Sequence, residues 1–275
     1  MGCSDGVDGV GGPRKPIDEC AIATTKAGRM TLASRRLCLI TAVLYTTWLI
    51  APLLDPQLHP WTSYASEYFV SGRPAATLLR TTDGLSGALL VVISVLSYAR
   101  LRIVWRGLRL DDDAAPAVGR VSTRRRERVA MRTWCAALAV AGLPTVVDAI
   151  NPMACAPSLD SACAAADSAG TLPMQHELHT ASSALAGIAF IIAMLASIVL
   201  STPADTAVRV SAWAGVVTIA VSGVDALDHL LPTEGITQRL PMIAIVVWLV
   251  SAAGLPAVDR LRRVERPHPK AAEAA

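Results

Sequence analysis

The amino-acid sequence predicts an all-α polytopic integral membrane protein. We expect a six-transmembrane-helix bundle, with an interfacial amphipathic helix between the first and second spans. Three observations support this fold class. The chain is 53% hydrophobic and only 17% charged, its apolar residues gather in long uncharged runs, and its Lys and Arg residues concentrate in alternate connecting segments. A soluble domain of this apolar content would interrupt its runs with charges.

Six segments are long and apolar enough to cross a bilayer, which takes about 20 mostly apolar residues. We expect spans over residues 37–54, 84–104, 133–150, 179–201, 210–231 and 240–258. The third and fifth segments are the weakest, because they reach a spanning length only with Asp148 and Asp225 at their ends. The six-span domain then covers residues 37–260. We expect a disordered N-terminal tail over residues 1–36 and a C-terminal tail over residues 261–275.

The distribution of positive charge predicts the orientation in the membrane. Of 25 Lys and Arg residues, 22 lie in the N-terminal tail, in the segment 100–132, at Arg209 or after Val258. Cationic segments stay in the cytoplasm, so we expect a multi-pass plasma-membrane protein with both termini cytoplasmic. The basic run Arg120–Arg132 lies between two spans, which favours a topology determinant over a nucleic-acid-binding region. We therefore expect membrane lipids, and no nucleic acid, as partners.

An amphipathic helix is predicted over Trp61–Pro74. Its apolar residues recur at i, i+3, i+4, i+7 and i+8, beginning at Trp61 and including Tyr64 and Tyr68. Trp and Tyr prefer the membrane interface, so this helix is expected to lie on the outer leaflet. Glu67 is the exception in this segment, because it stands between apolar neighbours.

The connection between the third and fourth spans contains two cysteines and no Lys or Arg. Cys155 and Cys163 lie in a segment of small residues. On the outer side of a membrane paired thiols tend to be oxidised, which predicts a disulfide that closes a short loop. A metal-binding pair is the alternative, although metal-binding cysteines usually lie closer together in sequence.

Several short fragments, in order along the chain, resemble a bacterial membrane-protein family known as domain of unknown function 998. The fragments are Ser66-Glu67, Gly72-Arg73-Pro74, Asp83-Gly84, the series Asp148, Pro152, Cys155, Asp160 and Cys163, then His176, His179, Ser182-Ser183, and Gly235 to Arg239 leading into Trp248. The resemblance would cover most of residues 37–260. It implies a six-span bundle without an assigned activity, so it informs the fold more than the function.

Ionisable side chains collect at the predicted outer ends of the spans, where burial in a membrane makes them candidates for function. Glu67 and Asp83 flank the interfacial helix, and the remaining candidates are Asp148, His176, His179, Asp225, Asp228 and His229. His176 and His179 are three residues apart, which places both imidazoles on one helix face. Asp148, His176, His179, Asp225 and His229 are the candidate ligands of a divalent metal such as zinc.

Three hypotheses for this polar pocket stay open. The first is a structural or ligand-binding role that handles lipid, or a lipid-like or isoprenoid ligand, at the outer leaflet. The second is a lipid-modifying enzyme, either a metal-dependent hydrolase or an acid–base enzyme of the isoprenoid-cyclase kind. In that hypothesis the catalytic residues come from Glu67, Asp148, His176, His179, Asp225 and Asp228, with Glu67 or Asp228 as the general base. The third is a transporter, which the lack of inverted repeats disfavours.

Overall fold

The computed structural model describes residues 32–109, 118–228 and 234–253, with side chains described in 32–103, 125–225 and 235–253. Within these residues all regular elements are helices: residues 32–45, η1 (Thr47–Ile50), α2 (Ala51–Leu54), η2 (Ala65–Phe69), α3 (Ala76–Arg109), α4 (Val118–Ile150), α5 (Ser161–Ser168), α6 (Met174–Leu200), α7 (Thr206–Asp228) and α8 (Glu234–Ala252). Six of the helical segments are long and apolar enough to cross a membrane. The predicted six-span helical bundle is confirmed.

The predicted boundaries change at several spans. The second span was predicted from residue 84, whereas α3 begins at Ala76, and the sixth from residue 240, whereas α8 begins at Glu234. The fifth span was predicted over residues 210–231, whereas α7 covers Thr206–Asp228.

Residues 32–36 were expected to belong to the N-terminal tail but are already helical. The third span was predicted from residue 133, whereas α4 begins at Val118 and takes in the basic residues that precede the span. The fourth span was predicted from His179, whereas α6 begins at Met174 and therefore includes His176. The expected tails at residues 1–31 and 261–275 lie outside the described residues.

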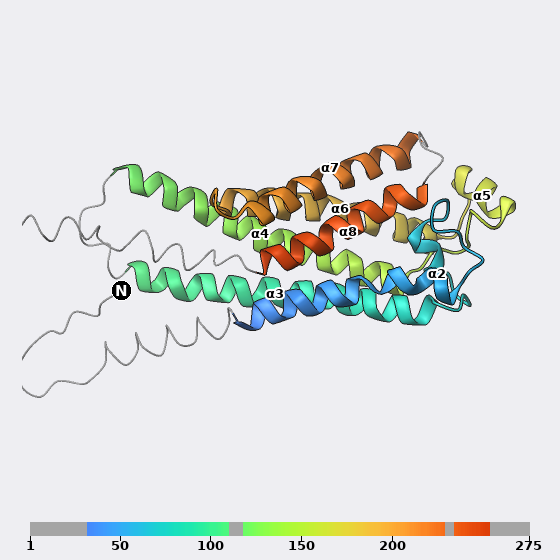
Figure 1. Ribbon diagram of the computed structural model, residues 1–275, viewed down its shortest axis with the longest axis horizontal. Coiled ribbons are helices and arrows are strands. Elements are labelled where there is room, and N and C mark those ends of the chain that lie inside the picture. The colour runs from blue at the N-terminus through green and yellow to red at the C-terminus, as the bar shows by residue number, and fades with distance from the viewer. Residues whose placement is uncertain (1–31, 110–117, 229–233, 254–275) are drawn as a thin grey trace, which may run out of the picture.

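The long helices run side by side along a common axis, with α2 and α5 at the same end of the bundle (Figure 1). Successive helices lie against one another, α3 on α4, α4 on α6, α6 on α7 and α7 on α8. We call the end that carries residues 55–75 and 151–173 the loop end. The helices α3, α6 and α8 begin there, and α4 and α7 end there. Side chains that are distant in sequence therefore meet at this end.

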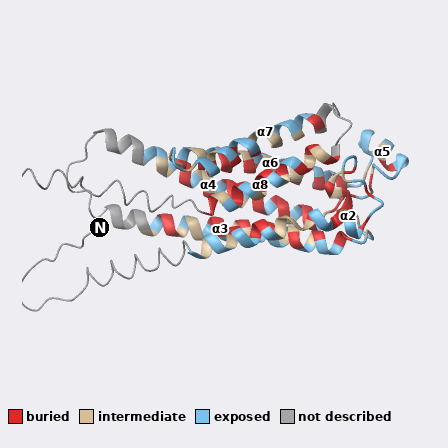
Figure 2. Ribbon diagram, viewed as in Figure 1, coloured by how far each residue is buried: buried red, intermediate tan, exposed pale blue. Residues whose placement is uncertain are grey.

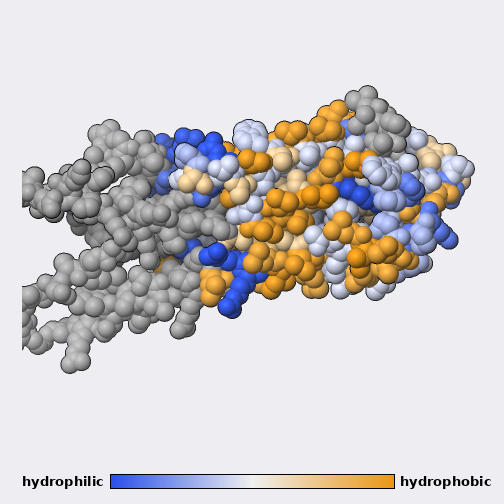
Figure 3. Space-filling model, viewed as in Figure 1, coloured by the Kyte–Doolittle hydropathy of each residue, from blue (hydrophilic) through white to orange (hydrophobic). Residues whose placement is uncertain are grey.

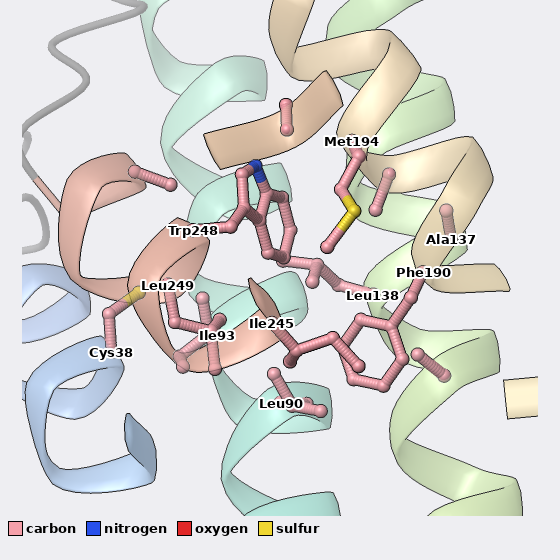
Figure 4. Packing of buried hydrophobic residues seen from close by; sticks show 14 of the residues in the cluster. Cys38, Leu90, Ile93, Ala137, Leu138, Phe190, Met194, Ile245, Trp248 and Leu249 are labelled. Atoms are coloured by element: carbon pink, nitrogen blue, oxygen red, sulfur yellow. The ribbon is translucent and has the colours of Figure 1, made fainter. Parts of the chain in front are cut away.

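The core lies between the first helix, α3, α4, α6 and α8 (Figures 2 and 4). Its central side chain is Trp248 of α8, which is fully buried and donates a hydrogen bond of 3.0 Å from Nε1 to the Ser197 hydroxyl. The Phe190 ring meets the Trp248 indole edge-on, with 6.5 Å between ring centroids. A polar group without a partner is costly in a membrane interior, so the Ser197 hydroxyl stabilises the buried indole.

The outer surface of the bundle is apolar. Large side chains such as Val95, Leu143, Ile188 and Val217 are each more than half exposed. Figure 3 shows hydrophobic residues over the middle of the bundle, with hydrophilic residues toward its two ends. An exterior of this kind suits contact with lipid chains, as expected for a membrane-spanning protein.

The helices α3 and α4 are in backbone contact at two glycines. A Cβ added to Gly142 would lie 2.4 Å from the carbonyl oxygen of Gly87, and a Cβ added to Gly87 would lie 2.6 Å from the carbonyl oxygen of Gly142. Small residues allow membrane helices to approach closely. Closer to the loop end, an added Cβ on Gly84 would lie 3.2 Å from Cβ of Ala149. The contact therefore extends toward the loop end.

The amphipathic helix predicted over Trp61–Pro74 is not confirmed. Only Ala65–Phe69 is helical, as a 3-10 helix. Tyr68 and Phe69 pack inward against Trp48 and neighbouring apolar residues, and the Tyr68 hydroxyl donates a 2.7 Å hydrogen bond to the carbonyl of Leu58. Tyr68 and Phe69 are thus buried within the protein, whereas Trp61 is exposed.

We predict that Gly142→Ala lowers the free energy of unfolding by about 1–3 kcal/mol, because the new methyl group would displace the backbone of α3. Thermal unfolding in detergent measures the effect. Gly223→Ala in α7 is the matched control, since an added Cβ there meets nothing within 4 Å. That control should be neutral or slightly stabilising. Equal stability of the two variants would contradict the importance of the crossing.

Candidate functional site

The predicted disulfide is present at the loop end. Cys155 and Cys163 are bonded, with their Cα atoms 6.1 Å apart. The helix α5 begins inside this loop, where the Asp160 carboxylate accepts a 2.9 Å hydrogen bond from the Ala162 amide. An aspartate at this position satisfies an amide that the first turn of a helix leaves free.

Glu67 lies at the centre of one group of contacts at the loop end. Its side chain is fully buried. Oε1 accepts a 3.0 Å hydrogen bond from the Tyr64 amide, and Oε2 accepts two from Ser158, at 3.2 Å from the amide and 2.5 Å from the hydroxyl. Both oxygens are therefore engaged. These contacts favour a structural role for Glu67, whereas the sequence made it a candidate general base.

Arg239 joins the same group from α8. Its Nη1 donates to the carbonyls of Ser63 and Gly235, at 2.8 and 2.7 Å. Its guanidinium carbon lies 5.8 Å from the centroid of the Tyr68 ring, and its charge interacts with that of Glu67. Burial raises the pKa of the Tyr68 phenol, which keeps the ring neutral beneath the guanidinium.

A second ion pair of the loop end was not predicted from the sequence. Arg73 donates two 2.6 Å hydrogen bonds to the buried Asp55 carboxylate. A bidentate Arg–carboxylate pair is among the strongest charge-assisted contacts in proteins. It ties the start of the segment 55–75 to its end.

Asp148 is the centre of a different group, on the interior of the bundle. Ser182 and Ser183 of α6 donate to its two carboxylate oxygens, Ser183 at 2.6 Å. Nδ1 of His179 lies 3.6 Å from Oδ1 of Asp148 and 3.1 Å from the carbonyl oxygen of Asn151. Because a carbonyl oxygen only accepts, Nδ1 carries the proton, and Nε2 has no partner among the described residues.

This geometry does not form a Ser–His–Asp nucleophile. The Ser182 hydroxyl donates to Asp148 and has further contacts with main-chain carbonyls of its own helix. No described contact joins its oxygen to the ring of His179. Activation of a serine requires that contact. The two serines instead orient the carboxylate.

Asp83 lies beside Asp148. It occurs on the inward face of α3, in register with the buried residues Leu79, Ser86 and Leu90. The adjacent residues Gly84 and Ala149 are in contact at the α3–α4 crossing. Asp83 and Asp148 are close enough for their charges to interact, and both lie within electrostatic range of Tyr45.

The Asp83 carboxylate has no hydrogen-bond or ion-pair partner among the described residues. The nearest cation in sequence, Arg80, is directed elsewhere. Its Nε donates to the carbonyl of Ala149 at 2.8 Å, and an Nη lies 3.4 Å from the carbonyl of Ile150. We call the residues Tyr45, Asp83, Asp148, His179, Ser182 and Ser183 the Asp83–Asp148 site. The sequence placed Asp83 among the ionisable side chains at the outer ends of the spans but not among the candidate catalytic or metal-binding residues, and it did not indicate Tyr45.

Two candidate metal ligands, Asp148 and His179, meet in the Asp83–Asp148 site, whereas His176 and Asp225 have other partners. Nε2 of His176 is 3.1 Å from Asp167, and its Nδ1 accepts a long contact of 3.4 Å from the Ala154 amide. Asp225 accepts a 2.7 Å hydrogen bond from Thr237. In the part of the chain that the structure describes, no three His, Cys, Asp or Glu residues are placed to hold a metal ion.

Those residues therefore do not supply the ligand set that zinc requires. His229 and the side chain of Asp228 lie outside the described residues. A metal site that includes them stays a prediction.

Six apolar spans, with the polar side chains gathered at the loop end, define a multi-pass membrane protein. Residues 114–255 match the family described as protein of unknown function (DUF998). This match covers just over half of the chain, so the protein belongs to that family. The matched residues include Asp148, His179 and the disulfide but begin after Glu67 and Asp83. No match was found among curated proteins or among solved structures.

We predict opposite effects on stability for the two carboxylates of the site. Asp148→Ala removes the acceptor of two serine hydroxyls, so the free energy of unfolding should fall by about 1–3 kcal/mol. Asp83→Asn removes a charge that has no partner, so stability should change by less than about 0.5 kcal/mol or should rise. Thermal unfolding of both variants in detergent checks this. A large loss of stability in Asp83→Asn would show that Asp83 is structural.

Proposed function

We propose that the protein binds, at the Asp83–Asp148 site, the positively charged head group of an amphiphile dissolved in the membrane. One observation carries the proposal: two neighbouring carboxylates within the bundle have no Lys or Arg partner among the described residues. Placing a charge inside a membrane protein is costly unless a partner compensates it. A cationic ligand would supply that compensation.

The contacts of Asp148 suit it to orient a ligand. The hydroxyls of Ser182 and Ser183 hold its carboxylate in one position, while the oxygens of Asp83 have no hydrogen-bond partner among the described residues. Nε2 of His179, whose Nδ1 lies near Asp148, is a further hydrogen-bonding atom of the site. A head group with an ammonium and a further polar atom would find a partner for each.

The surroundings of Asp83 support an amphiphilic ligand. Its side chain is half-buried, so it is not sealed inside the bundle, although the exposed Leu78 and Leu85 lie on the opposite, outward face of the same helix. The head of a ligand would reach the carboxylates while its aliphatic chain remains among the lipid chains around the bundle. Snorkelling of polar groups from lipid toward a buried partner follows the same principle.

We further propose that the loop end faces outside the cell. The distribution of Lys and Arg supports this orientation, since only three of 25 lie in the segments of the loop end or beside them. The Cys155–Cys163 disulfide supports it too, because disulfides persist in oxidising compartments. A plasma membrane with both termini cytoplasmic is consistent with these two observations.

A second candidate function is acid–base chemistry on the bound amphiphile. The specific observation is the proton on Nδ1 of His179, which leaves Nε2 as a basic nitrogen beside Asp148. Asp83 would then serve as the acid. Proton transfer between positioned groups of this kind is a common catalytic device.

The ligand proposal is tested by thermal shift in a neutral maltoside detergent. Hexadecylamine, hexadecanol and hexadecyl phosphate are added to the purified protein at matched mole fractions. We expect only the amine to raise the melting temperature, because binding to the folded state stabilises it. Asp83→Asn should weaken the apparent affinity for the amine by about tenfold or more.

Glu177→Gln is the matched control, since it removes an exposed carboxylate from the same end of the bundle. It should respond to the amine as the wild type does. An equal response to the alcohol would point to an amphiphile site without charge selectivity. An amine response that persists in Asp83→Asn would place the ligand elsewhere.

A further inference from the structure

We propose that the Cys155–Cys163 disulfide is a redox-sensitive latch that acts through Ser158 on Glu67 and the start of α8. This device is independent of any ligand at the Asp83–Asp148 site. It rests on a continuous series of contacts from the disulfide to the first turns of α8.

The first step joins the disulfide loop to Glu67. Ser158 lies between the two bonded cysteines, and its amide and hydroxyl both donate to Oε2 of Glu67. The hydroxyl oxygens of Ser158 and Ser63 are 2.8 Å apart, and Ser63 accepts a 3.1 Å bond from the His59 amide. The loop therefore supplies two donors to Oε2.

The second step joins the segment around Glu67 to α8. The Ala65 amide donates to Oε1 of Gln238 at 2.5 Å, and Arg239 donates to the carbonyl of Ser63. The backbone of α8 also approaches closely, because a Cβ added to Gly235 would lie 2.7 Å from that carbonyl. Residues 63–67 are thus held between the disulfide loop on one side and α8 on the other.

Reduction would release the first of these connections. A dithiol attacks the Cys155–Cys163 bond, both cysteines leave as thiols, and the dithiol is oxidised to its own disulfide. The attack falls on Cys155, which is half-buried, whereas Cys163 is buried. The open loop regains conformational freedom, so Ser158 is no longer held against Glu67.

The loss of Ser158 matters because Glu67 is fully buried. A buried carboxylate that loses two hydrogen-bond donors is less favourable, so the segment 63–67 is expected to rearrange. The far side of the loop stays attached, since His176 contacts both Ala154 and Asp167. Release is therefore directed toward Glu67 and α8 rather than spread over the whole loop end.

Hydrogen exchange of the full-length protein in detergent, read by mass spectrometry, tests the latch. Wild-type protein is compared before and after treatment with dithiothreitol, which avoids a variant that fails to fold. We expect exchange to accelerate by about tenfold or more in peptides covering residues 63–69 and 235–240. Peptides at the α3–α4 crossing should not change.

Two variants separate the latch from simple loosening of the loop. Ser158→Ala removes the hydroxyl donor and keeps the amide donor, so exchange at residues 63–69 should be faster than in the wild type while the disulfide is intact, and reduction should add less there than it adds in the wild type. Ser168→Ala, whose hydroxyl contacts only the Ala164 carbonyl of its own helix, should behave as the wild type. If reduction accelerates exchange only within residues 155–163, the disulfide is a local staple and the proposal is wrong. A full response to reduction in Ser158→Ala would equally overturn it.

Discussion

The backbone contact between α3 and α4 is the constraint on which the loop end depends. Gly87 and Gly142 allow the two helices to approach until any side chain would collide with the opposite backbone. Asp83 lies one turn before Gly87, and Asp148 lies less than two turns after Gly142. The close approach of the helices therefore brings two carboxyl groups together, where two negative charges would repel each other.

Buried charges at the loop end are of two kinds. Glu67, Asp55 and Arg239 are surrounded by partners and hold the connecting segments in place. Asp83 has an interior position without partners in the described residues, and His179 has one nitrogen without a partner. Proteins tolerate unsatisfied polar groups chiefly where function requires them. This difference directs attention to the Asp83–Asp148 site rather than to the more deeply buried Glu67.

The sequence was sufficient for the fold class, the number of spans and the disulfide, because each depends on composition or on local spacing. Uncharged runs of spanning length leave few alternatives to helices in a bilayer. The segment 61–74 was misjudged for a physical reason. Aromatic residues at helical spacing suit a membrane interface and a protein core equally well, and only the tertiary contacts of Tyr68 distinguish the two.

The sequence could not predict which polar residues contact one another, because those contacts also depend on the tertiary structure. Spacing places His176 and His179 on one face of α6, but their partners come from Asp167 and from Asn151 in the loop. Whether Asp83 has a partner depends on the side chains packed around it, and no local sequence pattern reveals this. A nearby arginine, Arg80, even suggests an ion pair that is not formed.

The position at which α4 ends determines where the Arg80 guanidinium of α3 is held. Its guanidinium is held by the carbonyls of Ala149 and Ile150, which are exposed as acceptors because α4 ends there. The last carbonyls of a helix lack internal donors. One more turn of α4 would satisfy them internally and release the guanidinium, three residues from Asp83, to act as a counter-ion within the chain. The point at which α4 stops therefore decides whether the neighbouring carboxylates have a counter-ion within the chain.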